Sequence, residues 1–209
     1  MEIHYYGANC IKLNNKKASI VIDDNLAELG LKSVTQPEDV ALYTLDKKVG
    51  GKGRFLINGP GEYEISEVSI KGIPARAHID ESGTQVTIYS LQMQDLKVAV
   101  LGHIYPELSD EQLEALGIID VLIIPVGGNG YTLDATSAAQ LIKKIEPKIV
   151  IPTHYADNSI KYEVPQAELK TFLSEMGVSD PEWMDSLKIK ESELGDKTRV
   201  VVLKRTNVK

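Results

Sequence analysis

The chain has 209 residues, 43% of them hydrophobic, which is enough to bury a sizeable core, and we expect one domain over residues 1–209. Its formal net charge of −7 comes without the basic stripe that neutralises phosphates, which argues against nucleic acid as a partner. No stretch approaches the ~20 apolar residues that cross a bilayer and no signal peptide is recognisable, so we expect no membrane association and a cytoplasmic location. A single cysteine excludes an internal disulfide and a thiolate-cluster metal site, so histidine and carboxylate would have to hold any metal.

Short segments that are rich in β-branched residues, or in which apolar and polar residues alternate, dominate the first half of the chain. Turn-forming sequences separate them at 14–15, 58–62 and 80–83. This pattern predicts an antiparallel, meander-like start. The predicted strands cover residues 2–7, 11–15, 18–23, 40–45, 55–59, 68–74, 84–91 and 96–102.

From residue 107 the pattern changes to alternating helices and buried strands. Ser109 and Gln112 form a capping-box pattern, and Asp134 is placed to cap a second helix. The predicted helices cover 110–117, 135–146 and 165–177, and the predicted strands cover 119–128, 148–152 and 196–205. Strands followed by this alternation indicate an α/β (α+β) fold, specifically a four-layer αββα sandwich of two sheets with helices on their outer faces.

Several long strings carry a resemblance to a known family. NGPGEYEI, VAVLGH, DEQLEALGIIDVLIIPVGG and EPKIVIPTHY together resemble the metallo-β-lactamase superfamily, in particular its small metal-dependent hydrolases, from about Met1 to Tyr155. The resemblance implies the same αββα fold. It also implies a site for one or two zinc-like ions, which lower the pKa of a bound water to roughly 7.

The metal-binding string of that family is largely absent. Where the family has THxHxDH, this chain reads TLDKKVGG, so Leu45, Lys47, Val49 and Gly50 stand at four ligand positions. The resemblance also implies a bridging aspartate at the position of His103, and a neutral imidazole has one lone pair and cannot bridge two cations. The usual dinuclear metal site is therefore predicted to be lost.

Two histidines remain as candidate metal ligands. His154 matches the family residue for residue, and His103 is expected on the same rim because both follow strands. A catalytic zinc takes three protein ligands and a water, so Asp46, Asp23 or His78 would have to supply the third. Lys47 would lie where the family has a metal, and a lysine ammonium beside a dication costs several kcal/mol. We therefore expect no cofactor. Only a rearranged mononuclear site would require zinc or another divalent metal.

The first functional hypothesis is a pseudoenzyme, hydrolase-like in fold, whose cleft binds a small anionic ligand or whose surface binds a protein partner. The alternative is a hydrolase of an ester, lactone or phosphodiester with a rearranged mononuclear site. A scaffold that works through oligomer contacts is the third, and the oligomeric state is left open. The cleft candidates are Asp23, Asp46, Lys47, His78, His103 and His154.

Overall fold

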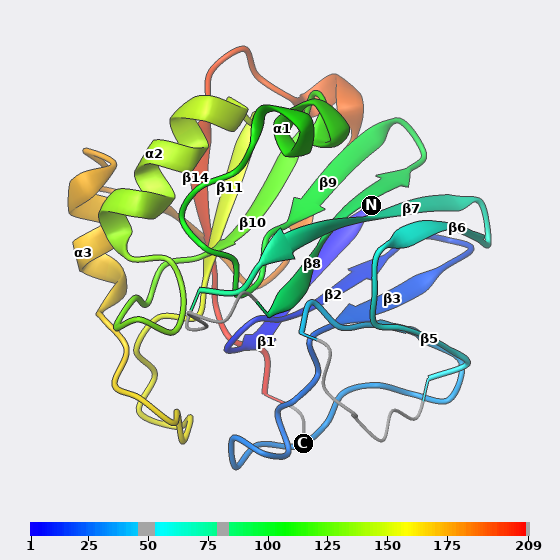
Figure 1. Cartoon of the computed structure of the whole chain (residues 1–209), viewed down its shortest axis with the longest axis horizontal. Helices are drawn as coiled ribbons and strands as arrows, with labels where there is room; N and C mark the ends of the chain where they lie inside the picture. Colours follow the sequence, from blue (N-terminus) through cyan, green and yellow to red (C-terminus); the bar gives the residue numbers. More distant parts are fainter. Residues whose placement is uncertain (46–52, 79–83, 208–209) are drawn as a thin grey trace.

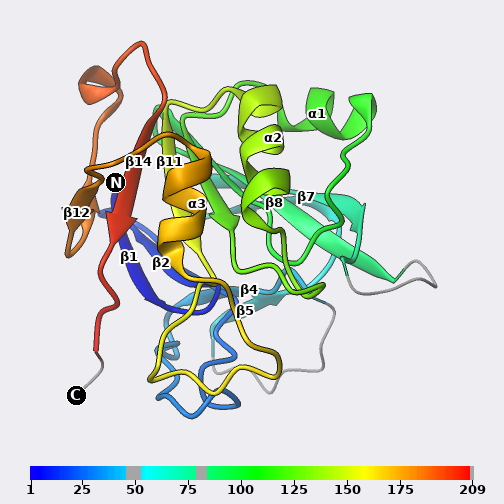
Figure 2. The same cartoon turned by 90° about the vertical axis from the view of Figure 1, so that its left-hand side faces the viewer.

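The computed structural model describes residues 1–45, 53–78 and 84–207. Two β-sheets pack face to face, and helices lie against one of them (Figure 1; Figure 2). The predicted α/β class with two packed sheets is confirmed. None of the helices in the described part of the chain is long and apolar enough to cross a membrane.

The first sheet has six strands within the described residues, in the order β13-β1-β2-β3-β4-β5. Its antiparallel part runs from β13 to β3, as the meander prediction expected, and β4 and β5 then join in parallel. The strands are β1 (Glu2–Gly7), β2 (Cys10–Asn14), β3 (Ser19–Ile22), β4 (Val40–Leu42), β5 (Phe55–Ile57) and β13 (Leu187–Lys188).

The second sheet has eight strands within the described residues, in the order β12-β14-β11-β10-β9-β8-β7-β6. The strands are β6 (Gly61–Ile65), β7 (Val68–Arg76), β8 (Gln85–Met93), β9 (Leu96–Val100), β10 (Val121–Pro125), β11 (Ile149–Thr153), β12 (Glu182–Met184) and β14 (Arg199–Leu203). Strands β9, β10, β11 and β14 are parallel neighbours. Their carboxyl ends therefore meet at one edge of the sheet, where the loops that follow them come together.

The helices are α1 (Asp110–Leu116), α2 (Ala135–Ile145), α3 (Leu169–Glu175) and the 3-10 turn η1 (Glu191–Glu193). The first two begin where the capping patterns predict. Ser109 and Gln112 form the predicted capping box, and the Asp134 carboxylate accepts from Ser137 N at 2.7 Å. Leu116, Leu141 and Phe172 bury the apolar faces of the helices on the eight-stranded sheet, forming a second core outside the one between the sheets.

The outer face of the six-stranded sheet is covered differently in the described residues. Leu26 and Val34, in the segment 24–35, pack on Cys10 and Val21 of that face. A loop covers this face, while the three α-helices named above cover the other sheet. The helices predicted for both outer faces therefore lie on one of them within the described residues.

Residues 165–168 correct the predicted third helix. The helix begins at Leu169 instead of 165, because Ala167 N donates to Gly127 O at 2.8 Å and Ala167 O accepts from Ala156 N at 2.9 Å. These two backbone bonds hold the segment extended against the ends of β10 and β11. Strands β6, β12 and β13 were also missed; the sequence at 58–62 indicated a turn, but β6 begins at Gly61.

Candidate functional site

The two candidate histidines lie together at the carboxyl edge of the parallel strands. His154 follows β11 directly, and His103 follows β9 after two further residues. Their ring centroids are 5.2 Å apart and the rings are nearly perpendicular, at 82°. Both side chains are buried, with 5% of His103 and 2% of His154 exposed. Strand order therefore brings together two residues that lie 51 positions apart in the sequence.

Two tyrosines complete this group, here named the histidine cluster: His103, His154, Tyr131 and Tyr162. The Tyr131 ring centroid lies 5.0 Å from that of His103 and 5.7 Å from that of His154. Tyr162 contacts His154, at 5.0 Å. Since His103, His154 and Tyr131 are all in mutual contact, each ring occupies space beside the other two.

A glutamine orients the His154 ring. His154 Nδ1 and Gln166 Oε1 are 3.0 Å apart, while Gln166 Nε2 donates to Val164 O at 2.9 Å. Because the amide nitrogen donates to Val164, the amide oxygen is the atom that faces His154. Nδ1 of His154 therefore donates a proton to this oxygen, and Nε2 carries the lone pair. Burial lowers the pKa of His154 from 6.5 to about 4, partly opposed by the bond to Gln166, so the ring is neutral at pH 7.

An asparagine lies beside His103. The Asn9 amide nitrogen is 3.4 Å from Nδ1 and 3.5 Å from Nε2 of His103, and its oxygen accepts from Thr153 Oγ1 at 3.0 Å. The Thr153 bond directs the amide N–H groups toward the imidazole. At these long distances the contact between Asn9 and His103 is weak.

The Asp23 carboxylate is bound by Thr44, two residues beyond the end of β4. It accepts from Thr44 N and Thr44 Oγ1, both at 2.7 Å, and the residue has a positive φ of 53°. Gly102 allows this arrangement, because a Cβ there would lie 2.3 Å from Thr44 Oγ1. Asp23 thus connects the end of β3 to the end of β4.

The neighbouring Asp24 anchors the segment 24–35. Its Oδ2 accepts from Ser33 Oγ, Val34 N, Thr35 N and Thr35 Oγ1, at 2.6–2.8 Å. The four bonds make this carboxylate a structural residue. It holds the loop that covers the six-stranded sheet.

Asp24→Asn is expected to lower the free energy of unfolding by about 2 kcal/mol, because charge-assisted bonds are replaced by weaker ones to a buried amide. Urea unfolding followed by circular dichroism measures the loss. Asp180→Asn, at an exposed position, is the control and should stay within about 0.5 kcal/mol of the parent. Equal stabilities for the two variants would contradict the anchoring role.

The other predicted site residues are less closely associated with the histidines. His78 donates its backbone N–H to His103 O at 2.9 Å, but its ring faces Tyr105, with centroids 6.3 Å apart. His78 therefore supports the His103 loop through its backbone. Asp46 and Lys47 lie outside the described residues, so their predicted roles stay predictions.

The described residues do not fit the metal centre that the fold implies. Across residues 1–45, 53–78 and 84–207 no group of three or more histidine, cysteine, aspartate or glutamate side chains is placed to hold a metal ion. A catalytic zinc takes three protein ligands. Within the described residues His103 and His154 supply two nitrogens, and they form no group of three with another histidine, cysteine, aspartate or glutamate side chain.

Four side chains of this site were not singled out from the sequence. Asn9, Tyr131 and Tyr162 lie in turns and loops, and Gln166 was assigned to a helix. Nothing in the local sequence pattern of these four residues indicated a contact with a histidine far along the chain.

Comparison with known proteins agrees with the fold. The family described as "Beta-lactamase superfamily domain" matches residues 2–154. A crystal structure of a metallo-β-lactamase superfamily protein from Thermotoga maritima superposes with a TM-score of 0.74 at 24% identity, covering 97% of each chain. This likeness concerns the fold.

Two curated relatives match shorter stretches. A UPF0173 protein of Pyrococcus furiosus is 34% identical over 100 residues, 47% of this chain and 46% of the relative. A UPF0173 metal-dependent hydrolase of Thermoplasma acidophilum is 40% identical over 48 residues, 22% of this chain and 21% of the relative. The matches thus span less than half the length of either relative. The family match covers most of the chain, and the chain belongs to the metallo-β-lactamase superfamily.

Proposed function

We propose that this chain is a hydrolase-like member of the superfamily that acts by binding rather than by hydrolysis, with the usual dinuclear site largely lost. The observation that carries the proposal is that, across residues 1–45, 53–78 and 84–207, no group of three or more histidine, cysteine, aspartate or glutamate side chains is placed to hold a metal ion. Beside the two histidine rings lies the ring of Tyr131, at centroid distances of 5.0 and 5.7 Å.

The proposed occupant of the cleft is a small anionic ligand, with a protein partner on the surface as the other possibility. Asn9 supplies amide N–H groups whose contacts with His103 are weak, at 3.4 and 3.5 Å. Burial, together with Glu163, Glu28 and Asp23, raises the pKa of Tyr131, so its hydroxyl stays protonated and can donate. Both groups offer hydrogen bonds to an anion. Lys47, outside the described residues, would add a positive charge.

A second candidate function is hydrolysis of an ester, lactone or phosphodiester with a rearranged mononuclear site. The observation that favours it is the bond from His154 Nδ1 to Gln166, because metal-bound histidines commonly donate their second N–H in this way. One curated relative is named a metal-dependent hydrolase. His103, His154 and a carboxylate outside the described residues, Asp46, would hold the ion.

The metal content of the purified protein distinguishes the binding function from the hydrolase function. Protein without a histidine tag is exposed to zinc, manganese and iron, exchanged into metal-free buffer and analysed by mass spectrometry. We expect less than stoichiometric metal, and no difference between the parent, His154→Asn and His103→Ala. His4→Asn, a substitution on β1, is the matched control for loss of a histidine. One equivalent that both cluster variants lose, but His4→Asn retains, would refute the binding proposal and support the hydrolase.

Ligand binding is tested by thermal unfolding with a panel of small carboxylates and phosphates. A ligand that raises the melting temperature of the parent should lose its effect in Asn9→Leu, which removes the amide donors, and in Tyr131→Phe, which removes the hydroxyl. A shift that persists in both variants would place the ligand elsewhere.

A further inference from the structure

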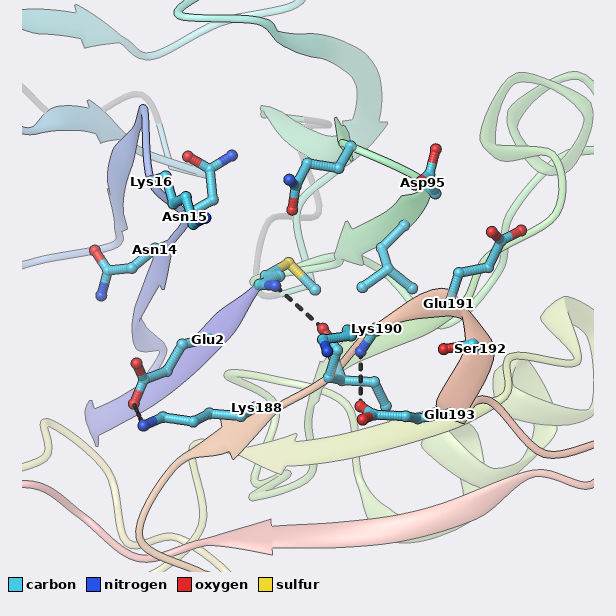
Figure 3. Close-up of a pocket in the computed structure, with 14 residues that line it drawn as sticks. Glu2, Asn14, Asn15, Lys16, Asp95, Lys188, Lys190, Glu191, Ser192 and Glu193 are labelled. Carbon is cyan, nitrogen blue, oxygen red and sulfur yellow. Dashed lines mark hydrogen bonds and ion pairs between the residues drawn. The ribbon is translucent and has the colours of Figure 1, made fainter.

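A cleft of about 850 Å³ lies at the start of β9, whereas His103 follows the far end of that strand (Figure 3). Lysines and carboxylates stand on both sides of this cleft, and Glu2 pairs with Lys188 at 3.8 Å. Leu96 and Ile189 are each 3% exposed, so they offer a ligand little apolar surface. The mixed charges select no class of ligand, in contrast to those of a smaller pocket.

The smaller pocket, of about 270 Å³, lies between the segment 24–35 and the C-terminal segment that follows β14. The segment 24–35 contributes Leu31 and Lys32, the C-terminal segment contributes residues 205–207, and β1 contributes Tyr6. None of the residues that line this pocket belongs to the histidine cluster.

Contacts with β1 hold both sides of the pocket in place. Thr206 N donates to Tyr5 O at 2.7 Å, which pairs the C-terminal segment with β1. A Cβ at Gly7 would lie 3.0 Å from Arg205 Cδ and 3.4 Å from Leu31 Cδ1. The glycine therefore lets both sides of the pocket pack closely on the strand, and the pocket is preformed.

The pocket has one positive charge that no carboxylate compensates in the described residues. The charged residues that line it are Lys32 and Arg205, and none of its described lining residues is acidic. Arg205 Nε donates to Asp157 Oδ2 at 2.7 Å, so that pair is neutral. Lys32 is exposed and forms no ion pair across residues 1–45, 53–78 and 84–207.

The carboxylates near Tyr6 are bound to other partners. Asp39 accepts from Lys12 Nζ at 2.9 Å, and Glu2 pairs with Lys188. Burial raises the pKa of Tyr6, and nearby groups, including Asp39 and Glu2, raise it further. Its hydroxyl therefore stays protonated at neutral pH and can donate a hydrogen bond.

The pocket also has hydrogen-bond donors that are unused in the described part of the chain. Asn207 Oδ1 accepts from Arg205 Nη1 at 2.7 Å, and because arginine only donates, this bond leaves the amide N–H groups of Asn207 to donate elsewhere. Arg205 Nη2 makes no hydrogen bond to a described residue. Together with the Lys32 ammonium, these groups favour a ligand that accepts hydrogen bonds and carries negative charge.

We propose that this pocket binds a small monocarboxylate that carries an apolar group. The ligand carboxylate accepts from Lys32 Nζ, Arg205 Nη2 and the Asn207 amide. The apolar group lies against Leu31 and the ring of Tyr6, which are both partly exposed.

Charge and volume both restrict the ligand. One negative charge matches the one uncompensated positive charge of Lys32, whereas a dianion would place a second negative charge close to Asp157. Pockets for drug-sized ligands commonly have volumes of about 300–1,000 Å³, and the volume here, about 270 Å³, fits a smaller molecule.

The test is a titration of ¹⁵N-labelled protein with phenylacetate, followed by amide chemical shifts. The amides of Leu31 and Thr206 are expected to shift in a saturable way at millimolar phenylacetate, because solvent-exposed ion pairs are weak and are screened by salt. Phenylacetamide, which lacks the charge, and acetate, which lacks the ring, should each bind about fivefold more weakly. Absence of shifts at these amides, or equal affinity for the three compounds, would overturn the proposal.

Two variants test the groups that bind the carboxylate. Lys32→Gln should weaken phenylacetate binding about fivefold and leave phenylacetamide binding unchanged. Arg205→Lys keeps a cation beside Asp157 but lacks Nη2, so it should also weaken phenylacetate binding about fivefold. Lys143→Gln, at an exposed position on α2, is the matched control for Lys32→Gln and should bind like the parent. Parent-like binding by both Lys32→Gln and Arg205→Lys would contradict the proposal.

Discussion

Gly127→Ala is expected to destabilise the protein by about 3 kcal/mol or more, because the position has no room for a methyl group. A Cβ there would lie 2.0 Å from the His154 carbonyl oxygen and 2.2 Å from Gln166 Oε1. The first atom belongs to the backbone at the end of β11 and cannot rotate away. The second accepts the proton of His154 Nδ1, so the substitution should also disturb the histidine cluster.

Urea unfolding measures this effect. Gly195→Ala is the control, since it is exposed and an added Cβ meets nothing within 4 Å, and it should change stability by no more than about 0.5 kcal/mol. Combining Gly127→Ala with Gln166→Ala removes the side-chain contact but leaves the carbonyl contact, so it should not restore stability. Full recovery in the double variant would show that the backbone contact is unimportant.

The stability of the parent protein should fall by about 3 kcal/mol between pH 6.5 and pH 4, relative to His154→Asn. The folded pKa of His154, about 4, lies below the unfolded value of 6.5. In this range the unfolded chain binds more protons than the folded one, so stability rises with pH, is complete above pH 6.5 and is lost toward pH 4. Asparagine suits the position because His154 has a φ of 53°, a region that asparagine tolerates.

Two measurements check this linkage. Urea unfolding at a series of pH values gives the difference in slope between the parent and His154→Asn, about 1.4 kcal/mol per pH unit in the steepest part. NMR titration of the His154 ring should give a midpoint near 4 in the folded protein, and near 6.5 in concentrated urea. Parallel stability curves for the two proteins would contradict burial of a neutral histidine.

Local patterns determined much of the fold. The capping box of Ser109 with Gln112 and the cap at Asp134 place two helix starts correctly, because a cap satisfies backbone N–H groups within the same turn. The strand Val121–Pro125 is buried at every position, as its continuous apolar run predicted. These features depend on residues a few positions apart, which a single sequence displays directly.

Contacts between distant segments decided the rest. Residues 165–168 have a helical composition, yet the bonds of Ala167 to Gly127 and Ala156 hold them extended. The short strands β12 and β13 form because neighbours far along the chain, β14 and β1, offer unpaired edges. Local propensity amounts to a few tenths of a kcal/mol per residue, so such pairing overrides it.

The candidate site also has features that the sequence predicted and features that only the tertiary structure showed. By itself the sequence identified His103 and His154 as residues at strand ends. The loss of the family's ligand string, which the resemblance implies, stays a prediction. Only the tertiary structure decided that Tyr131 contacts both rings, that Gln166 orients His154, and that Thr44 binds Asp23. The physical reason is that strand order and loop packing bring these side chains together, and hydrogen bonds between them leave no periodic trace in the sequence.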